Sequence, residues 1–182
     1  MQRRTFLWTA VAATATNALA HTMAASVPAK SFVVKAGKGR FGEQTRLGGV
    51  NPNDIKVSVD DTGGQLSVLE YTGHQKGGPP LHIHPHQDEI FYVLDGQYLF
   101  QVGNEQQTLT AGDLIFLPRN VPHTFAQLSD AGRLLFFFQP AGKMENYFRT
   151  LGKLSGPPSP PEGAKIFADH DMQVVGPPLA IH

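Results

Sequence analysis

Hydrophobic and polar residues alternate along much of the chain with the period of a β-strand. Residues 55–59 (IKVSV) place an apolar side chain at every second position, as in a strand with one buried face. Residues 90–94 (IFYVL) and 134–138 (LLFFF) are apolar throughout, which is typical of strands packed inside a double sheet. Asp95-Gly96 then gives a strong hairpin signal. The pattern therefore predicts short strands joined by tight turns.

Segments of this kind recur at nearly regular spacing between residues 31 and 138. Besides the segment that carries His82 and His84, we predict strands at residues 31–35, 55–59, 65–71, 90–94, 98–102, 106–109, 114–117, 123–128 and 134–138. Many short strands separated by turns predict an all-β fold, either an antiparallel sandwich or a barrel. No internal repeat is visible, which favours one barrel over two.

The spacing of apolar residues becomes helical after the last strand. Residues 143–151 (KMENYFRTL) place their apolar side chains on one side of a helix. The proline-rich residues 155–161 cannot continue that helix, and residues 163–170 predict a second short one. We therefore expect a helical and extended C-terminal extension over residues 143–182, which packs across the barrel mouth or against a partner subunit.

The first twenty residues have the pattern of a targeting signal. Arg3-Arg4 precedes a short apolar run that ends in small residues, and RRTFL resembles the twin-arginine export motif. We predict a twin-arginine-type signal peptide at residues 1–20 and a flexible mature N-terminus at residues 21–30. The alternative is an amphipathic first helix of the mature fold. The apolar run is too short and too rich in threonine for a stable membrane span, so we expect a protein that is exported to the periplasm or secreted.

Composition argues against several classes of function. The chain has 182 residues, enough for one domain with a sizeable core. Its 15 basic and 15 acidic residues balance, and no basic run follows Arg3-Arg4, so no nucleic-acid partner is expected. Cysteine is absent, which removes disulfides and thiolate ligands. Any metal must therefore be bound by histidine, carboxylate or water.

Candidate metal ligands occur between Gly78 and Gly96. His82 and His84 are two residues apart, so both side chains lie on the same face of an extended strand. Glu89 follows after a distance that allows the chain to turn and present a carboxylate beside them. Two imidazoles and one carboxylate are the beginning of a transition-metal site.

A second segment, residues 112–127, supplies another histidine. Strand alternation puts Val121, His123, Phe125 and Gln127 on one face. The two segments together resemble the paired motifs of the cupin superfamily. The first motif, His-x-His, four residues, Glu, six residues and Gly, is met by His82, His84, Glu89 and Gly96. The second, Gly, five residues, Pro, four residues and His, is met by Gly112, Pro118 and His123.

This resemblance implies the fold and the cofactor. Its fold is the cupin double-stranded β-helix (jelly-roll) barrel, here over residues 31–142. It implies one divalent transition-metal ion per chain, held by His82, His84, Glu89 and His123. Iron, manganese, nickel, cobalt and copper all accept this ligand set, so the metal itself stays open.

Three positions depart from the motifs without touching a ligand. Lys76 stands where the first motif often opens with glycine, and Asn120 replaces the glycine at a corner. Asparagine tolerates the left-handed conformation that such a corner requires. Gln127 replaces the usual asparagine and is expected to keep a polar amide near the cavity.

Within the superfamily, residues 77–96 and the ending at residues 175–179 resemble the single-domain quercetinase-like cupins. That resemblance implies a metal-dependent dioxygenase, with a small-molecule substrate and dioxygen as partners, and homodimers. Its substrate would be a flavonol or related aromatic enol, held on the metal as its enolate, with Glu89 as the base. Other cupin reactions, decarboxylation or isomerisation, remain alternatives, as does a non-catalytic barrel that binds a metal or small ligand.

The remaining candidates concern the pocket and the other histidines. We expect an apolar wall made by Phe91, Tyr98, Phe100 and Phe125, with Gln127 orienting the substrate, although each aromatic residue taken singly fits the core better than the pocket. His86 shares the face of His82 by parity, but Pro85 breaks the strand, which favours a place at the rim or surface. Asp88 is expected to be a solvated neighbour of Glu89. Surface positions are expected for four further histidines: His21, His74, His170 and His182.

Overall fold

The computed structural model describes residues 30–47 and 50–181. The predicted signal peptide, residues 1–20, lies outside these residues, as do His21, His182 and nearly all of the predicted flexible segment 21–30. In the described part of the chain, none of the helices has the length and apolar character needed to cross a membrane.

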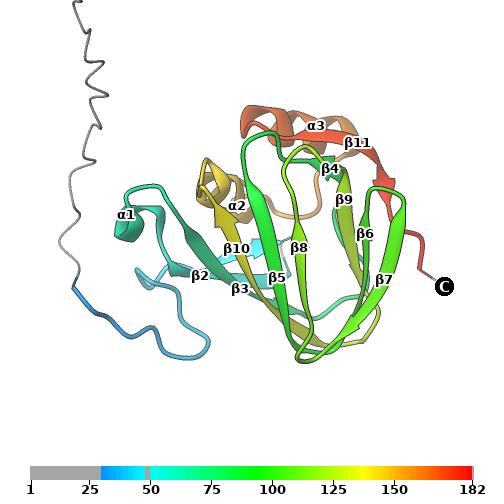
Figure 1. The fold of residues 1–182 in the computed structure, drawn as a ribbon. Helices are drawn as coiled ribbons and strands as arrows, with labels where there is room; N and C mark the ends of the chain where they lie inside the picture. Colours follow the sequence, from blue (N-terminus) through cyan, green and yellow to red (C-terminus); the bar gives the residue numbers. More distant parts are fainter. Residues whose placement is uncertain (1–29, 48–49, 182) are drawn as a thin grey trace, which may run out of the picture.

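Two antiparallel sheets face each other, which confirms the predicted all-β jelly-roll barrel (Figure 1). The first sheet has six strands in the order β1 (Thr45–Leu47), β2 (Asn51–Val57), β3 (Ser67–Gly73), β10 (Gly132–Gln139), β5 (Asp88–Asp95) and β8 (Leu114–Leu117). The second has five in the order β11 (Gln173–Pro178), β4 (Pro80–Ile83), β9 (His123–Gln127), β6 (Gln97–Val102) and β7 (Glu105–Thr110).

The barrel has a closed and an open side. On the closed side, β5 and β8 lie against β6 and β7. On the open side, the end of the first sheet that carries β1, β2 and β3 faces β4 and β11, and two helices cover it: α2 (Met144–Gly152) and α3 (Pro160–Asp169). Helix α2 buries the apolar stripe that its spacing predicts, namely Met144, Tyr147, Phe148 and Leu151.

One buried acid fastens α2 to the six-stranded sheet. Glu145 accepts hydrogen bonds from the hydroxyls of Ser58 and Ser67, at 3.0 and 2.8 Å, and from the amide of Val59, at 2.6 Å. Ser58 is also the N-cap of the short helix α1 (Val59–Thr62). Residues 60–64, which look like a plain turn in the sequence, thus include part of α1, and the turn follows at Gly63, whose backbone is left-handed.

The first predicted strand, residues 31–35, is wrong. This segment has no strand partner among the described residues, and the first strand begins at Thr45. Val33 is 79% exposed, and Phe32 lies under the guanidinium of Arg40 instead, 3.8 Å from its ring centre. Strand propensity alone does not form a strand where no neighbouring edge is offered.

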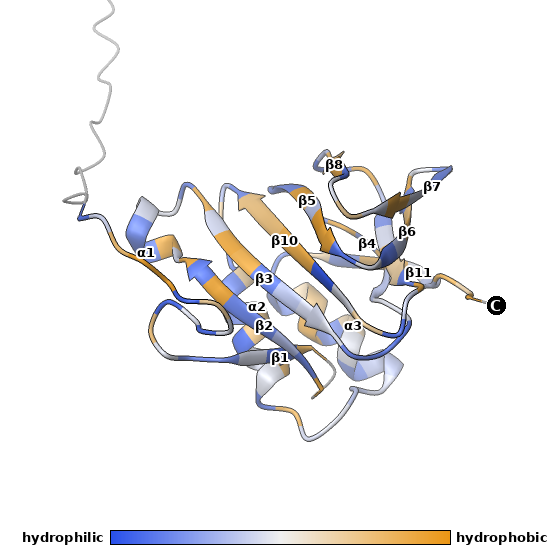
Figure 2. Cartoon of the chain, turned by 90° about the horizontal axis from the view of Figure 1, so that it is seen from below, coloured by the Kyte–Doolittle hydropathy of each residue, from blue (hydrophilic) through white to orange (hydrophobic). Residues whose placement is uncertain are grey.

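The two continuously apolar strands, β5 and β10, also differ from the prediction. Only alternate residues of β5 and β10 face the core, among them Phe91, Val93 and Phe136, while the residues between them point outward. Tyr92, for example, is 36% exposed. Figure 2 colours β5 and β10 as apolar over most of their length. The second face of these strands is therefore not part of the core that the described residues form.

The C-terminal extension contributes a strand as well as two helices. Helix α3 begins at Pro160, three residues before the predicted start, because proline is well suited to the first turn of a helix. Strand β11 then pairs with β4, with Val174 opposite His82. The end of the chain thus lies against a strand of the candidate metal site.

Candidate metal centre

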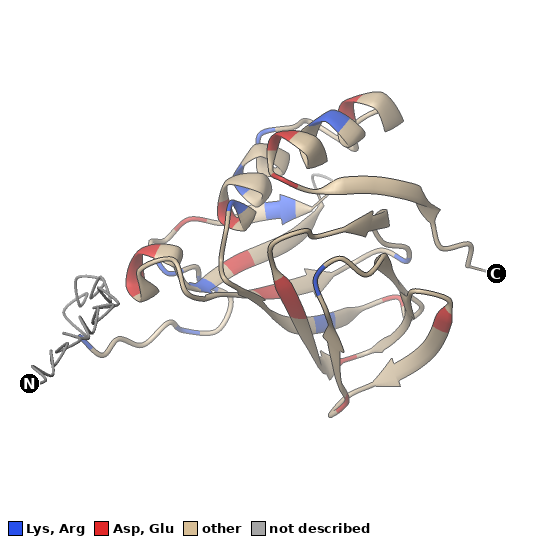
Figure 3. Cartoon of the chain, turned by 45° about the horizontal axis from the view of Figure 1, so that its top comes forward, with Lys and Arg blue, Asp and Glu red and all other residues tan. Residues whose placement is uncertain are grey.

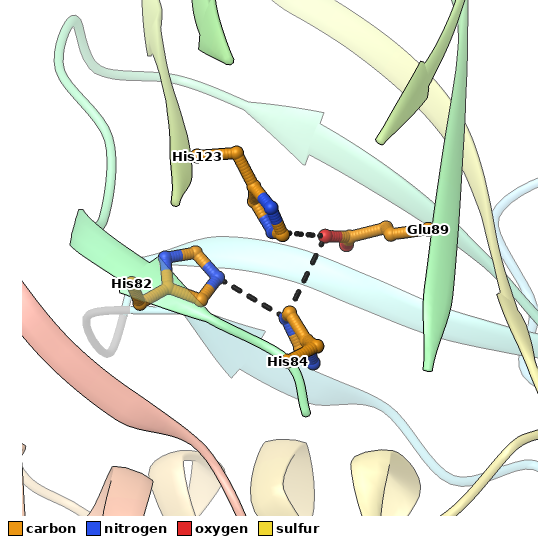
Figure 4. A group of neighbouring side chains, drawn as sticks. All are labelled: His82, His84, Glu89 and His123. Atoms are coloured by element: carbon orange, nitrogen blue, oxygen red, sulfur yellow. Dashed lines mark hydrogen bonds and ion pairs between the residues drawn. The ribbon is translucent and has the colours of Figure 1, made fainter. Parts of the chain in front are cut away.

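Four side chains from three strands meet between the two sheets. His82 lies on β4, and His84 follows directly after that strand; His123 lies on β9, opposite His82 in the antiparallel register. Glu89 comes from β5 in the other sheet. Figure 4 shows the four side chains pointing toward one another. The histidines therefore share one sheet, and the carboxylate reaches them across the interior.

The ligand atoms are close enough to bind a single ion. The Nε2 atoms of His82 and His84 are 3.2 Å apart, and Glu89 Oε2 lies 3.7 Å from His84 Nε2 and 3.2 Å from His123 Nε2. All four donor atoms lie within 4.8 Å of one another. Each residue is at most 6% exposed.

Two backbone carbonyls determine which imidazole nitrogen faces the centre. His82 Nδ1 lies 2.8 Å from the carbonyl of Pro80, and His123 Nδ1 lies 2.9 Å from the carbonyl of Val121. A carbonyl only accepts, so each Nδ1 carries the proton and donates it. Both rings therefore direct Nε2 to the interior, and an imidazole whose Nε2 carries no proton is the form that binds a metal.

Burial shifts the proton affinities of these groups in opposite directions. It lowers the pKa of His82 to about 3, and the neighbouring His123 lowers it further in the same sense. Burial likewise holds the pKa of His84 well below its usual range. For Glu89, burial raises the pKa, while contact with His123 acts the other way. The site thus disfavours imidazolium and, without a positive charge, also disfavours the carboxylate.

The donor set fits a transition-metal ion. The buried His123 Nε2 has no assigned hydrogen-bond partner among the described residues, although Glu89 Oε2 lies 3.2 Å away. A divalent cation would accept these lone pairs and neutralise the buried carboxylate. Three imidazoles and one carboxylate suit iron, manganese, nickel, cobalt or copper, and the geometry does not select among them.

A cavity of about 630 Å³ opens beside this group on the open side of the barrel. Its walls are largely apolar and come from the six-stranded sheet, α2, α3 and the proline-rich segment before α3. Phe167 of α3 packs edge-on against His82, with ring centres 5.1 Å apart. All four candidate ligands contribute to the cavity surface.

The structure corrects part of the predicted pocket wall. Phe91 and Phe125 line the cavity, but Tyr98, Phe100 and Gln127 do not. Phe100 and Tyr98 lie behind Phe125, with ring centres 5.7 and 6.1 Å from it, on the closed side. Gln127 is fully buried, and its amide nitrogen donates to the carbonyl of Ser129 at 2.9 Å. The Gln127 amide is thus engaged in a hydrogen bond with the backbone, so it cannot orient a ligand in the cavity.

Sequence reasoning missed the wall that the helices provide. Tyr147, Phe148 and Leu151 of α2 and Phe167 of α3 all line the cavity. Burial raises the pKa of Tyr147, and the charge of Glu89 adds to the shift. The helical spacing of residues 143–151 was the available signal, but it does not tell whether the apolar face meets a packed core or a cavity.

The other polar residues of the first motif lie outside the group. His86 is exposed, and Asp88 pairs with Arg119 at 2.6 Å, a contact that lowers the pKa of Asp88 to about 2. His74 is exposed as expected, whereas His170 is half-buried: its Nδ1 lies 2.7 Å from the carbonyl of Ile166. The surface prediction for His170 is therefore wrong.

Two departures from the cupin motifs have simple structural outcomes. Asn120 has a φ of 65°, the left-handed conformation expected for the residue that replaces a corner glycine. Lys76 is exposed and lies 3.3 Å from Asp130.

Acidic and basic residues are scattered over both sheets and the helices (Figure 3).

Comparison with known proteins agrees with this geometry. The model of the cupin domain family matches residues 69–138, a segment that contains all four candidate ligands. The crystal structure of an RmlC-like cupin from Shewanella frigidimarina superposes with a TM-score of 0.53 at 21% identity, covering 64% of this chain and 96% of that one. The chain therefore carries a cupin domain at residues 69–138, within the barrel.

Two curated relatives are similar over shorter shares of their length. Quercetin 2,3-dioxygenase of Bacillus subtilis is 28% identical over 121 residues, which cover 66% of this chain and 34% of that enzyme. An uncharacterized protein of Streptomyces coelicolor is 35% identical over 57 residues, or 31% of this chain and 54% of that protein. The chain thus spans about a third of the first relative and about half of the second.

Proposed function

We propose that the protein is a metal-dependent dioxygenase of the quercetinase-like type, which cleaves a flavonol or a related aromatic enol with dioxygen. One observation carries the proposal: a buried group of three histidines and one glutamate opens into an apolar cavity of about 630 Å³. Pockets of about 300–1,000 Å³ enclose most of a drug-sized ligand. The similarity to a quercetin 2,3-dioxygenase supports the same reading.

His82, His84, Glu89 and His123 would hold the metal. When bound, the metal would supply Lewis-acid stabilisation of negative charge on a substrate oxygen and a site for dioxygen. The carbonyls of Pro80 and Val121 keep two of the imidazoles in the ligating tautomer. The edge-on packing of Phe167 against His82 restrains the orientation of the His82 ring.

Glu89 is the residue that would accept the proton of the enol. Its carboxylate faces the cavity and is 4% exposed, and burial raises its pKa toward the range in which a carboxylate is an effective base. A proton taken from the substrate hydroxyl would reside on Oε2 or Oε1, at the surface of a cavity that Phe138 and Tyr147 also line. The apolar walls would exclude water from the deprotonated substrate.

The deciding experiment combines metal analysis with an oxygen assay. Protein isolated with its native metal is mixed with quercetin without oxygen, and oxygen uptake is followed after air is admitted. We expect one equivalent of metal per chain and oxygen uptake that matches the loss of quercetin. Metal far below one equivalent would refute the site, and full metal without oxygen uptake on any enol would leave a different cupin reaction or a binding protein.

A matched pair of variants separates the site from the histidine-rich segment around it. His84→Ala should lose most of the metal, because a buried ligand is removed. His86→Ala should retain it, because His86 is exposed and outside the group. Equal metal content in the two variants would contradict the ligand assignment.

We also propose that the chain is exported through a twin-arginine pathway, on the basis of RRTFL at residues 3–7. Export in the folded state would allow the metal to be loaded before translocation. Replacing Arg3 and Arg4 by lysine should leave the protein in the cytoplasmic fraction. Unchanged export would refute the proposal.

A further inference from the structure

The three candidate histidine ligands differ in how their outer nitrogens are paired. His82 and His123 each hold Nδ1 within 2.9 Å of the backbone carbonyl two residues earlier. His84 differs, because its Nδ1 is buried and makes no hydrogen bond to any of the described residues. The backbone therefore does not determine which nitrogen of His84 carries the proton, as it does for the other two rings.

Gln87 offers the complementary group. The residue is 4% exposed, and its Oε1 also lacks a hydrogen-bond partner in the described part of the chain. Burial and the neighbouring histidines lower the pKa of His84, whereas the Gln87 side chain acts in the opposite sense, as an acceptor beside a ring N–H does. The amide therefore lies beside the imidazole. A buried donor and a buried acceptor that remain unpaired are both destabilising, so a bond between them is favoured.

The turn between β4 and β5 keeps Gln87 near the ring. At its start, the amide of Asn120 donates to the carbonyl of His84 at 2.9 Å. At its end, the amide of Arg119 donates to the carboxylate of Asp88 at 2.9 Å. Because both ends of this short turn are fixed, the buried Gln87 side chain stays close to the His84 imidazole.

The packing around Gln87 leaves space for its amide. Gly142 has a φ of 55°, a left-handed conformation that favours glycine, and a Cβ at this position would overlap the amide nitrogen of Gln87. The described wall of the cavity does not include Gln87. This side chain would therefore act through His84 and not on a bound substrate.

His84 has a second place for its proton. Its Nε2 lies 3.2 Å from Nε2 of His82, which carries its own proton on Nδ1 and can therefore accept. A proton on His84 Nε2 would satisfy this contact in the metal-free chain, but it would occupy the lone pair that a metal needs. A proton on His84 Nδ1 leaves that lone pair free. The partner of Nδ1 thus decides whether His84 is ready to bind a metal.

We propose that Gln87 is a positioning residue: its Oε1 accepts a hydrogen bond from Nδ1 of His84 and holds this imidazole in the tautomer whose Nε2 is free for the metal. The inference rests on the ligand set assigned under the proposed function, and it does not depend on which reaction the site catalyses. All three histidines would then have an acceptor behind the ring, two of them a backbone carbonyl and one a side chain.

The direct test is the tautomer of His84 in the full, metal-free chain near neutral pH. Long-range proton–nitrogen NMR correlations of isotope-labelled histidine distinguish Nδ1–H from Nε2–H, and the His84 signals are identified by their loss in His84→Ala. We expect Nδ1–H in the parent chain. Gln87→Leu keeps a side chain of similar size but removes the acceptor, so a substantial share of His84 should change to Nε2–H.

The affinity for cobalt(II) gives an independent measurement, by absorbance titration of the metal-free full chain against a competing chelator. Gln87→Leu should bind cobalt about 10–100-fold more weakly than the parent, the usual loss when the outer partner of a ligating histidine is removed. Gln87→Glu retains an acceptor and should recover most of the affinity.

A matched control lies on β6, away from the candidate ligands. The amide of Gln101 donates to the carbonyl of Gly103 at 3.1 Å, so Gln101→Leu also removes a bonded amide. This variant should bind cobalt as tightly as the parent. Melting temperatures of the metal-free variants show that each one is folded.

Three results would overturn the inference. The first is Nε2–H at His84 in the parent chain, or the same tautomer in the parent and in Gln87→Leu. The second is an unchanged cobalt affinity in Gln87→Leu. The third is an equal loss in Gln87→Leu and Gln87→Glu, which would assign the effect to packing in the turn. A parent chain that binds no cobalt would refute the ligand set and the inference with it, whereas tight binding in both the parent and Gln87→Leu would refute the role of Gln87 alone.

Discussion

The open and closed sides of the barrel interior are built by the same strand alternation, yet they do different things. On the closed side, Phe100 packs behind Phe91 and Phe125, with ring centres 5.2 and 5.7 Å away, and leaves no cavity there. On the open side, the inward positions hold the histidines and Glu89, and helices replace the missing strands as a cover. Strand alternation thus determines which side chains face inward. Whether those side chains pack together or leave a cavity depends on what covers them, strands on one side and helices α2 and α3 on the other.

The largest expected effect is on the open side. Glu89→Gln should reduce dioxygenase turnover at least about 100-fold, because the amide cannot accept the enol proton. Much of the metal should remain, since three histidines still bind it. Oxygen uptake and metal content measured on the same sample check this. Full activity in the variant would exclude Glu89 as the base, and the open side would then have no identified catalytic residue.

Phe125 lies on the border between the two sides, and Phe125→Ala tests how firmly the closed side is packed. Loss of its contacts with Phe91, Phe100 and Tyr98 should lower the free energy of unfolding by about 3–5 kcal/mol. Phe41→Ala, at an exposed position, should change it by less than about 0.5 kcal/mol. Urea unfolding gives both values. A small loss at Phe125 would mean that the closed side is loosely packed.

The pH dependence of the metal-free protein should come from the open side. The pKa of His82 is about 3 in the folded chain and near 6.5 when unfolded, so only the unfolded state binds the proton between these values. Stability from this histidine is present above about pH 6.5 and is lost as the pH falls toward 3, by on the order of a few kcal/mol. Melting temperatures between pH 7 and 4 measure the slope.

His82→Leu is the matched variant for this slope. It should melt with a clearly weaker dependence on pH over the same range, because the titrating group is gone. An identical slope in the two proteins would show that a group other than His82 governs the acid response.

Two buried tyrosines give the smallest effect and the sharpest contrast. Tyr98→Phe, on the closed side, should cost about 0.5–1.5 kcal/mol of stability, because Gln127 loses a hydrogen-bond donor, and should leave turnover unchanged. Tyr147→Phe, in the cavity wall, should alter kcat or KM with little change in stability. Unfolding and steady-state kinetics on both variants test this, and a common pattern would contradict the division into two sides.

The sequence predicted the strands and the candidate ligands because both depend on short-range spacing. His82 and His84 lie on one face of the strand because they are two residues apart. The motif around His123 identified the remaining histidine ligand, on β9. Parity does not give the position around the barrel, which is why Tyr98, Phe100 and Gln127 were wrongly assigned to the cavity. The apolar strands 90–94 and 134–138 were expected inside a double sheet, but the described chain covers only one of their faces.

The single buried acid on α2 has a further consequence for how a substrate gains access. Glu145 receives three hydrogen bonds from residues 58–67, and each bond to a charged acceptor is worth about 1.5–3 kcal/mol. Moving α2 away from the sheet would break all three hydrogen bonds, so this helix is held in place. The Ser159 side chain makes no capping bond at the start of α3. Any change in the opening of the cavity should therefore come from other parts of its wall, which include residues 157–160, and not from α2.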